Sequence, residues 1–117
     1  MTLVRLLVGM CVAIAVVAVF AAPETAARDT AAGDPIRGKK VFDSSVPQCS
    51  LCHTIRGRGG KLGPDLTKVG VTRNAAWLTK FLPDPRATDP VSKMPAVAAK
   101  GKELDDLVAY LMTLKGK

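Results

Sequence analysis

The sequence predicts a small all-α domain with about three main helices and long loops between them. The clearest helix is 102–114, where apolar residues recur at helical spacing, namely Leu104, Leu107, Val108, Leu111 and Leu114. Asp34 followed by Pro35 is typical of a helix N-terminus, because aspartate caps the first turn and proline fits its first position. Alternating patterns that would predict strands are nearly absent, so the Gly-rich and Pro-rich stretches predict loops.

One pentapeptide carries the strongest chemical signal in the chain. Cys49-Ser50-Leu51-Cys52-His53 has the Cys-x-x-Cys-His spacing of a covalent attachment site for a c-type haem. We expect the thiols of Cys49 and Cys52 to form thioethers with the haem vinyl groups and His53 to ligate the iron. His53 is the only histidine of the chain, so a second iron ligand has to be a methionine, a lysine, a water or a group from another subunit.

Two other uses of these thiols stay open at this point. A structural zinc site requires four Cys or His ligands, and the third cysteine, Cys11, lies far upstream in an apolar run. A thioredoxin-like dithiol requires strands that alternate with helices, a pattern that the sequence lacks. Covalent haem is therefore the preferred interpretation.

The first 22 residues read as an export segment. Arg5 precedes an unbroken apolar stretch, 6–20, and small residues follow it, as in a cleavable signal peptide. Residues 6–22 together are only slightly shorter than a membrane span, so an uncleaved N-terminal anchor stays open. Residues 23–33 predict a flexible linker and 34–117 the haem domain. Export to the periplasm, or out of the cytoplasm in general, agrees with c-type haem attachment.

The haem domain is small for a self-sufficient core, because only about 80 residues follow the linker. Buried porphyrin surface contributes roughly 2.5 kcal/mol per 100 Å². We therefore expect the haem-free polypeptide to be poorly folded.

Further elements follow along the chain. Gly38 lies inside the first helix, which predicts close approach of another helix there. Residues 54–65 are too rich in glycine to predict regular structure. Thr72 is the expected N-cap of a helix over 73–82, which Pro83 ends.

Met94 is the best candidate for the second iron ligand. Met1 and Met10 belong to the export segment, and Met112 lies in the patterned last helix, where methionine is usually core. Met94 lies in an irregular stretch and precedes Pro95, which stiffens its backbone. A methionine packed on the haem ring, or ligation by Met112, stays open.

With these residues in place, 34–117 resembles the small class I c-type cytochromes. Gly38 and Phe42 match the glycine and the aromatic residue of that family's first helix, and Tyr110 matches the aromatic residue of its last. The resemblance implies the small cytochrome c fold, with long loops around one covalent haem.

The resemblance also implies roles for individual residues. Gly63-Pro64 matches the loop in which a proline carbonyl accepts the N–H of the proximal histidine. Lys93-Met94-Pro95 matches the methionine loop of the family. Trp77 matches a position where an aromatic residue often lies near a haem propionate.

An iron with His and Met ligands has no open site for a substrate, which favours one-electron transfer over enzyme catalysis. We therefore expect a one-electron carrier in an exported redox chain. One alternative is a haem c subunit or membrane-anchored relay of a dehydrogenase or oxidase complex. Another is a gas sensor, if Met94 is labile.

The charge balance bears on partners. Lys and Arg number 17 against 10 Asp and Glu, for a formal net charge of +7. Nucleic acid is a poor partner for an exported haem protein. Arg56, Arg58 and Lys61 predict a basic surface that binds an acidic face of a redox partner protein, and a scattered solvated surface is the alternative. Membrane contact is expected only if the N-terminal segment is retained.

Overall fold

The computed structural model describes residues 33–116, so the predictions for the export segment and for most of the linker lie outside the described residues. In the described part the α-helices are α1 (Pro35–Ser44), α2 (Val69–Thr72), α3 (Ala75–Phe81), α4 (Pro85–Thr88) and α5 (Lys102–Thr113). A 3₁₀ turn, η1 (Cys49–Leu51), and two short strands, β1 (Thr54–Ile55) and β2 (Arg58–Gly59), complete it. None of the helices described is long and apolar enough to cross a membrane. The all-α prediction is confirmed.

Helix α1 begins as predicted. The Asp34 carboxylate accepts hydrogen bonds from the backbone N–H groups of Ile36 at 2.8 Å and Arg37 at 3.4 Å. Pro35 takes the first position, where its missing N–H costs no hydrogen bond. Only Gly38 and Phe42 of this helix are buried, so the helix packs through one narrow face.

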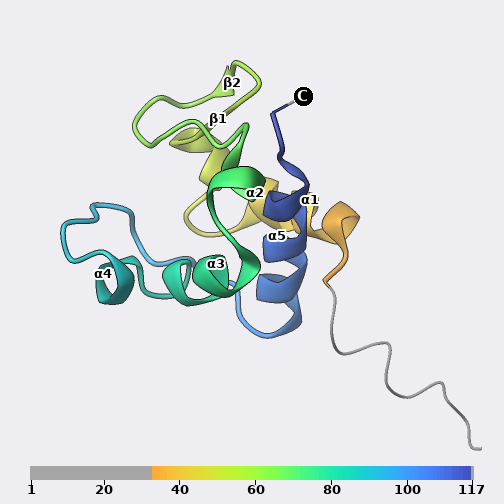
Figure 1. The fold of residues 1–117 in the computed structure, drawn as a ribbon. Coiled ribbons are helices and arrows are strands. Elements are labelled where there is room, and N and C mark those ends of the chain that lie inside the picture. The colour runs from red at the N-terminus through yellow and green to blue at the C-terminus, as the bar shows by residue number, and fades with distance from the viewer. Residues whose placement is uncertain (1–32, 117) are drawn as a thin grey trace, which may run out of the picture.

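Helices α1 and α5 pack side by side although they come from opposite ends of the described chain (Figure 1). A Cβ built on Gly38 would overlap the backbone carbonyl of Asp106. The rings of Phe42 and Tyr110 meet edge to face at the same crossing, 5.6 Å between centroids. The predicted close approach at Gly38 is confirmed.

A buried carboxylate of α5 binds the N-terminal end of α1 where the two helices cross. Asp106, whose side chain is 5% exposed, accepts a hydrogen bond from Nε of Arg37 at 2.8 Å. It also accepts one from the backbone N–H of Asp34 at 2.6 Å. Because both donors belong to the start of α1, they fix that helix against α5.

Helix α5 supplies more of the buried core than any other single element. The leucine and valine positions predicted from its pattern are buried, and Leu107 is fully enclosed. Residues of the preceding helices and loops pack on this face, namely Phe42, Val69, Leu78, Leu82, Val97 and Ala99.

The predicted helix over 73–82 begins later than expected. Asn74 caps α3, because its side-chain oxygen accepts the N–H of Trp77 at 2.8 Å. Thr72 instead ends α2. That single turn forms against the last helix, where the N–H of Gly70 donates to the carbonyl of Leu114 at 2.9 Å. Tertiary packing, which the local pattern does not reveal, therefore divides the segment in two.

The prediction that 54–65 lacks regular structure is also wrong. Strands β1 and β2 form an antiparallel hairpin, with Thr54 opposite Gly59. The two turn residues, Arg56 (φ 49°) and Gly57 (φ 77°), both have positive φ. Positive φ at both turn positions matches the twist of a hairpin, and glycine supplies it without strain.

Candidate functional site

The helices and loops enclose a cavity of about 680 Å³, a size typical of cofactor pockets. Its walls are mainly apolar and come from α1, α2, α3, α5 and the residues next to them, namely Phe42, Leu66, Val69, Leu78, Phe81, Leu82, Leu107 and Leu111. A group placed there packs mainly against apolar side chains. The predicted site residues Cys49, Cys52, His53, Pro64, Trp77 and Met94 all line this cavity.

The η1 turn brings the two thiols and the imidazole to one wall. The N–H groups of Cys52 and His53 both donate to the carbonyl of Cys49, at 3.1 and 2.9 Å. Cys49 is buried, and this burial raises the pKa of its thiol, although Ser45 Oγ at 3.4 Å from the sulfur opposes the shift. Both cysteines are free thiols within the described structure.

The imidazole of His53 is buried and held in one orientation. Its Nδ1 lies 2.8 Å from the carbonyl oxygen of Pro64. A carbonyl can only accept, so Nδ1 carries the proton and Nε2 keeps its lone pair for a metal. A Cβ on Gly63 would overlap the ring, so a glycine is needed where this loop crosses the imidazole.

The β1–β2 hairpin and the residue after it form hydrogen bonds with the backbone of the Cys49–His53 motif. The N–H of Gly60 donates to the carbonyl of Ser50 at 2.9 Å, and the hydroxyl of Thr54 donates to the carbonyl of Gly60 at 2.6 Å. The backbone that carries Cys49 to His53 is therefore held by the glycine-rich loop. Glycine is required at position 60, because a Cβ there would overlap the carbonyl of Leu51.

Met94 reaches the same cavity from the loop after α4. It is partly buried and packs against the core. Its N–H donates to the hydroxyl of Ser92 at 3.3 Å, and the N–H of Val97 donates to the carbonyl of Leu82 at 2.9 Å. The loop is thus fixed on both sides of the methionine. Met112 packs against the core from α5 and is not among the residues that line the cavity.

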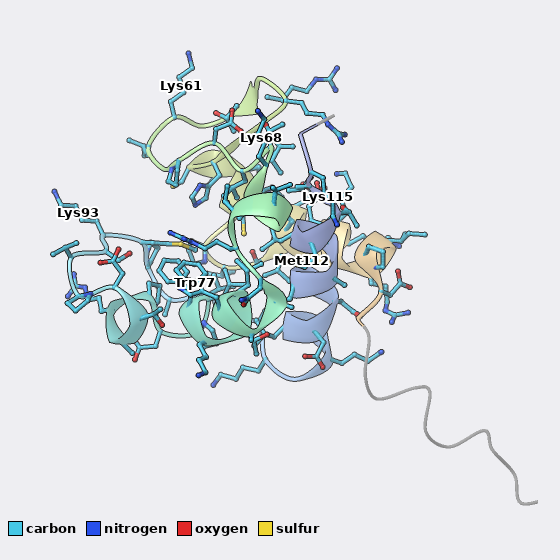
Figure 2. The ribbon with its side chains drawn as sticks, in the orientation of Figure 1. Lys61, Lys68, Trp77, Lys93, Met112 and Lys115 are labelled. Carbon is cyan, nitrogen blue, oxygen red and sulfur yellow. The ribbon has the colours of Figure 1, made fainter. Side chains whose placement is uncertain are left out.

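Trp77 lies on the α3 wall of the cavity (Figure 2). It stacks on Phe81, with ring centroids 4.3 Å apart and an interplanar angle of 16°. The guanidinium of Arg73 lies on the indole, 4.5 Å from the ring centroid. The sequence reasoning did not single out Arg73, although a cation four residues before a tryptophan is a recognisable spacing for such a contact.

These residues fit a covalently held haem. The cavity offers two free thiols on one turn, an imidazole with its metal-binding nitrogen available, and apolar walls for a macrocycle. In residues 33–116 no group of three His, Cys, Asp or Glu side chains converges as another metal site. Fold and site together define a small domain that binds haem c.

Comparison with known proteins agrees. The sequence model of the family Cytochrome c matches residues 36–115. Cytochrome c2 of Rhodomicrobium vannielii is 32% identical over 110 residues, covering 74% of this chain and 84% of that protein. Cytochrome c of Euglena viridis is 33% identical, covering 71% of this chain and 99% of that protein. The chain therefore belongs to the cytochrome c family, whose members carry electrons on covalently bound haem c.

The fold has solved counterparts. A chain in the crystal structure of SoxXA from P. pantotrophus superposes with a TM-score of 0.64 at 23% identity, covering 73% of this chain and 84% of that one. At this identity the likeness concerns the fold, and it confirms the predicted small cytochrome c architecture.

Proposed function

We propose that the protein is a one-electron carrier of an exported redox chain, with His53 and Met94 as the axial ligands of its haem iron, and that it is not an enzyme. The observation that carries this proposal is that both side chains line one cavity, from segments that are separately fixed. When bound, haem c would supply an iron that gains and loses one electron.

The residues of the chain have several tasks in this function. The Pro64 carbonyl keeps the His53 imidazole in one tautomer and orientation. The thioether of Met94, a neutral soft donor, favours ferrous iron and raises the reduction potential. The apolar walls exclude water, and two protein ligands leave no coordination position for a substrate.

Optical spectra test the ligand assignment. We expect oxidised wild-type protein to show a sulfur-to-iron charge-transfer band that Met94→Leu abolishes. Met112→Leu is the matched control, because Met112 packs in the core, and it should keep the band. If Met94→Leu retains the band, or wild-type protein lacks it and binds carbon monoxide rapidly when reduced, the carrier assignment fails.

We further propose that the partner is a redox protein with an acidic face that binds at the β1–β2 hairpin. Arg56, Arg58 and Lys61 are exposed there, and Figure 2 shows Lys61 pointing outward. The ion pairs among the described residues all involve α1, through Arg37 or Lys39. The hairpin cations are therefore available to a partner, and they lie close to the attachment motif.

Two charge-matched double variants test this face. Arg58→Gln with Lys61→Gln, and Lys80→Gln with Lys102→Gln, remove the same charge from different places. We expect the hairpin pair to slow electron transfer to a small acidic copper protein and to reduce its dependence on salt more than the control pair. Equal effects would indicate a scattered basic surface instead.

We also propose that residues 1–22 direct export to the periplasm. Mass spectrometry of the mature protein, together with cell fractionation, tests this. A cytoplasmic haem-free product contradicts the proposal. An uncleaved, membrane-bound product with a stable co-purifying oxidoreductase would favour the complex-subunit alternative.

A further inference from the structure

Thr54, the residue directly after His53, forms hydrogen bonds with both ends of one loop. Its hydroxyl donates to the carbonyl of Gly60 at 2.6 Å, and its own carbonyl accepts the N–H of Leu66 at 2.8 Å. Gly60 and Leu66 begin and end the segment 60–66, which we call the proximal loop because its middle crosses the His53 ring. One residue therefore joins the two ends of this loop.

The proximal loop carries the group that orients the imidazole. The carbonyl oxygen of Pro64 lies 2.8 Å from Nδ1 of His53. Packing of the loop tip contributes little to the position of this oxygen, since Leu62 is 89% exposed. The N–H of Gly63 donates to the carbonyl of Cys52 at 2.7 Å. The Pro64 carbonyl is therefore placed by this backbone hydrogen bond and by the two ends of the loop.

The two ends are held in different ways. Leu66 packs against the hydrophobic core, so side-chain packing also fixes its end of the loop. Gly60 has no side chain, and it is held by hydrogen bonds alone, from its N–H to the carbonyl of Ser50 at 2.9 Å and to its carbonyl from the Thr54 hydroxyl. The hydroxyl of Thr54 is thus the side-chain group that fixes the Gly60 end.

We propose that Thr54 is a positioning residue for the iron ligand His53 and acts through the proximal loop on the Pro64 carbonyl. A firm hydrogen bond from Nδ1 to that carbonyl makes the imidazole a more basic ligand, which favours ferric iron. If the loop loosens, this bond weakens, and the reduction potential rises. The proposal rests on the assignment of His53 as an iron ligand and does not depend on Met94.

The test uses haem-loaded Thr54→Val, in which a methyl group of similar size replaces the hydroxyl. Thr79→Val is the matched control, because the Thr79 hydroxyl donates to the carbonyl of Ala75 at 2.8 Å on the exposed side of α3. At a fixed electrode potential we expect the ratio of reduced to oxidised protein to rise by about twofold to fivefold for Thr54→Val. The control should keep the wild-type ratio.

The imidazole proton gives a second measurement. In proton NMR spectra of the reduced protein, the Nδ1–H of His53 should exchange with solvent about tenfold faster in Thr54→Val than in wild type. Thr54→Ser keeps the hydroxyl and loses the methyl group, so it should retain the wild-type ratio and the slow exchange. If Thr54 only filled space, valine would be the better replacement and serine the worse one.

The proposal is overturned if Thr54→Val keeps both wild-type values, or if Thr54→Ser changes them as much as Thr54→Val does. If Thr54→Val does not load haem, hydrogen exchange of the wild-type protein decides. The Nδ1–H of His53 should then be protected as strongly as the amide N–H of Leu66, because both depend on the same loop, and a far weaker protection of the imidazole proton overturns the proposal.

Failure of the ligand assignments is visible separately. Loss of Met94 as a ligand appears in the charge-transfer band and leaves the Thr54 comparison intact. A reduced wild-type protein whose His53 signals are not shifted by the haem ring current would contradict the ligation by His53 itself.

Discussion

The backbone of Gly38 in α1 lies directly against the carbonyl group of Asp106 in α5, with no space for a side chain between them. This contact sets how closely the two helices approach, and it also brings Phe42 and Tyr110 into edge-to-face contact. The stability of the whole domain therefore depends on the absence of a side chain at position 38.

Gly38→Ala should lower the free energy of unfolding by about 1 to 3 kcal/mol, because overpacking forces α1 away from α5. Alanine is the better helix former by roughly 1 kcal/mol, which offsets part of this loss. Guanidinium denaturation of the haem-loaded protein measures it. Lys40→Ala, on an exposed position of α1, is the control and should stay within about 0.5 kcal/mol of wild type. If Gly38→Ala is more stable than the wild-type protein, α1 and α5 do not approach each other as described.

Asp106→Asn should destabilise the protein at neutral pH and much less in acid. Hydrogen bonds from Arg37, and also from the backbone N–H of Asp34, hold the pKa of Asp106 below its ordinary value. A carboxyl group with a lowered folded-state pKa contributes stability above its unfolded pKa of about 3.9 and loses it as the pH falls through the folded-state pKa. Melting temperatures from pH 7 to pH 2 check this.

The control for Asp106 is Asp43→Asn. Asp43 forms an ion pair with Lys39 in which both side chains are about half exposed, and such pairs contribute little. A gap between Asp106→Asn and wild type that does not narrow in acid would contradict the role assigned to the carboxylate.

Gly63→Ala should disturb the iron site without unfolding the protein. The new methyl group would overlap the His53 ring, so the imidazole has to move from the position that the Pro64 carbonyl fixes. We expect a larger high-spin fraction in the ferric optical spectrum. Leu62→Ala, at a side chain that is 89% exposed in the same loop, should leave the spectrum unchanged. Identical spectra for both variants would mean that the ring does not require the glycine.

Absence of haem should abolish cooperative unfolding. The cavity of about 680 Å³ borders Phe42, Leu107 and Leu111, which are core residues, so an empty cavity exposes the centre of the domain to water. Polypeptide produced without haem attachment should show weak helical circular dichroism and a broad melt. A sharp, reversible transition in that material would refute this expectation.

The sequence was most informative where local chemistry decides the structure. The Asp34-Pro35 cap, the buried face of α5 and the close approach at Gly38 all follow from residue types at fixed spacing. The motif from Cys49 to His53 is equally local, because five adjacent residues carry it. These predictions needed no knowledge of distant contacts.

The wrong predictions concern places where contacts between distant segments determine the local structure. Thr72 and Asn74 are both good caps, and the contact between Gly70 and the carbonyl of Leu114 determines which one begins a helix. Each strand of the β1–β2 hairpin is only two residues long, and the hairpin is held by a hydrogen bond to the turn that carries Ser50. The spacing of Arg73 and Trp77 allows a contact between them, and the structure shows that the guanidinium lies over the indole ring.

The pairing of α1 with α5 has a consequence for biosynthesis. A nascent chain that has emerged only as far as Gly101 already possesses Cys49, Cys52 and His53, yet it lacks the helix that closes one side of the pocket. We therefore expect the pocket to stay open on one side until the carboxyl-terminal helix has been synthesised and packs against α1.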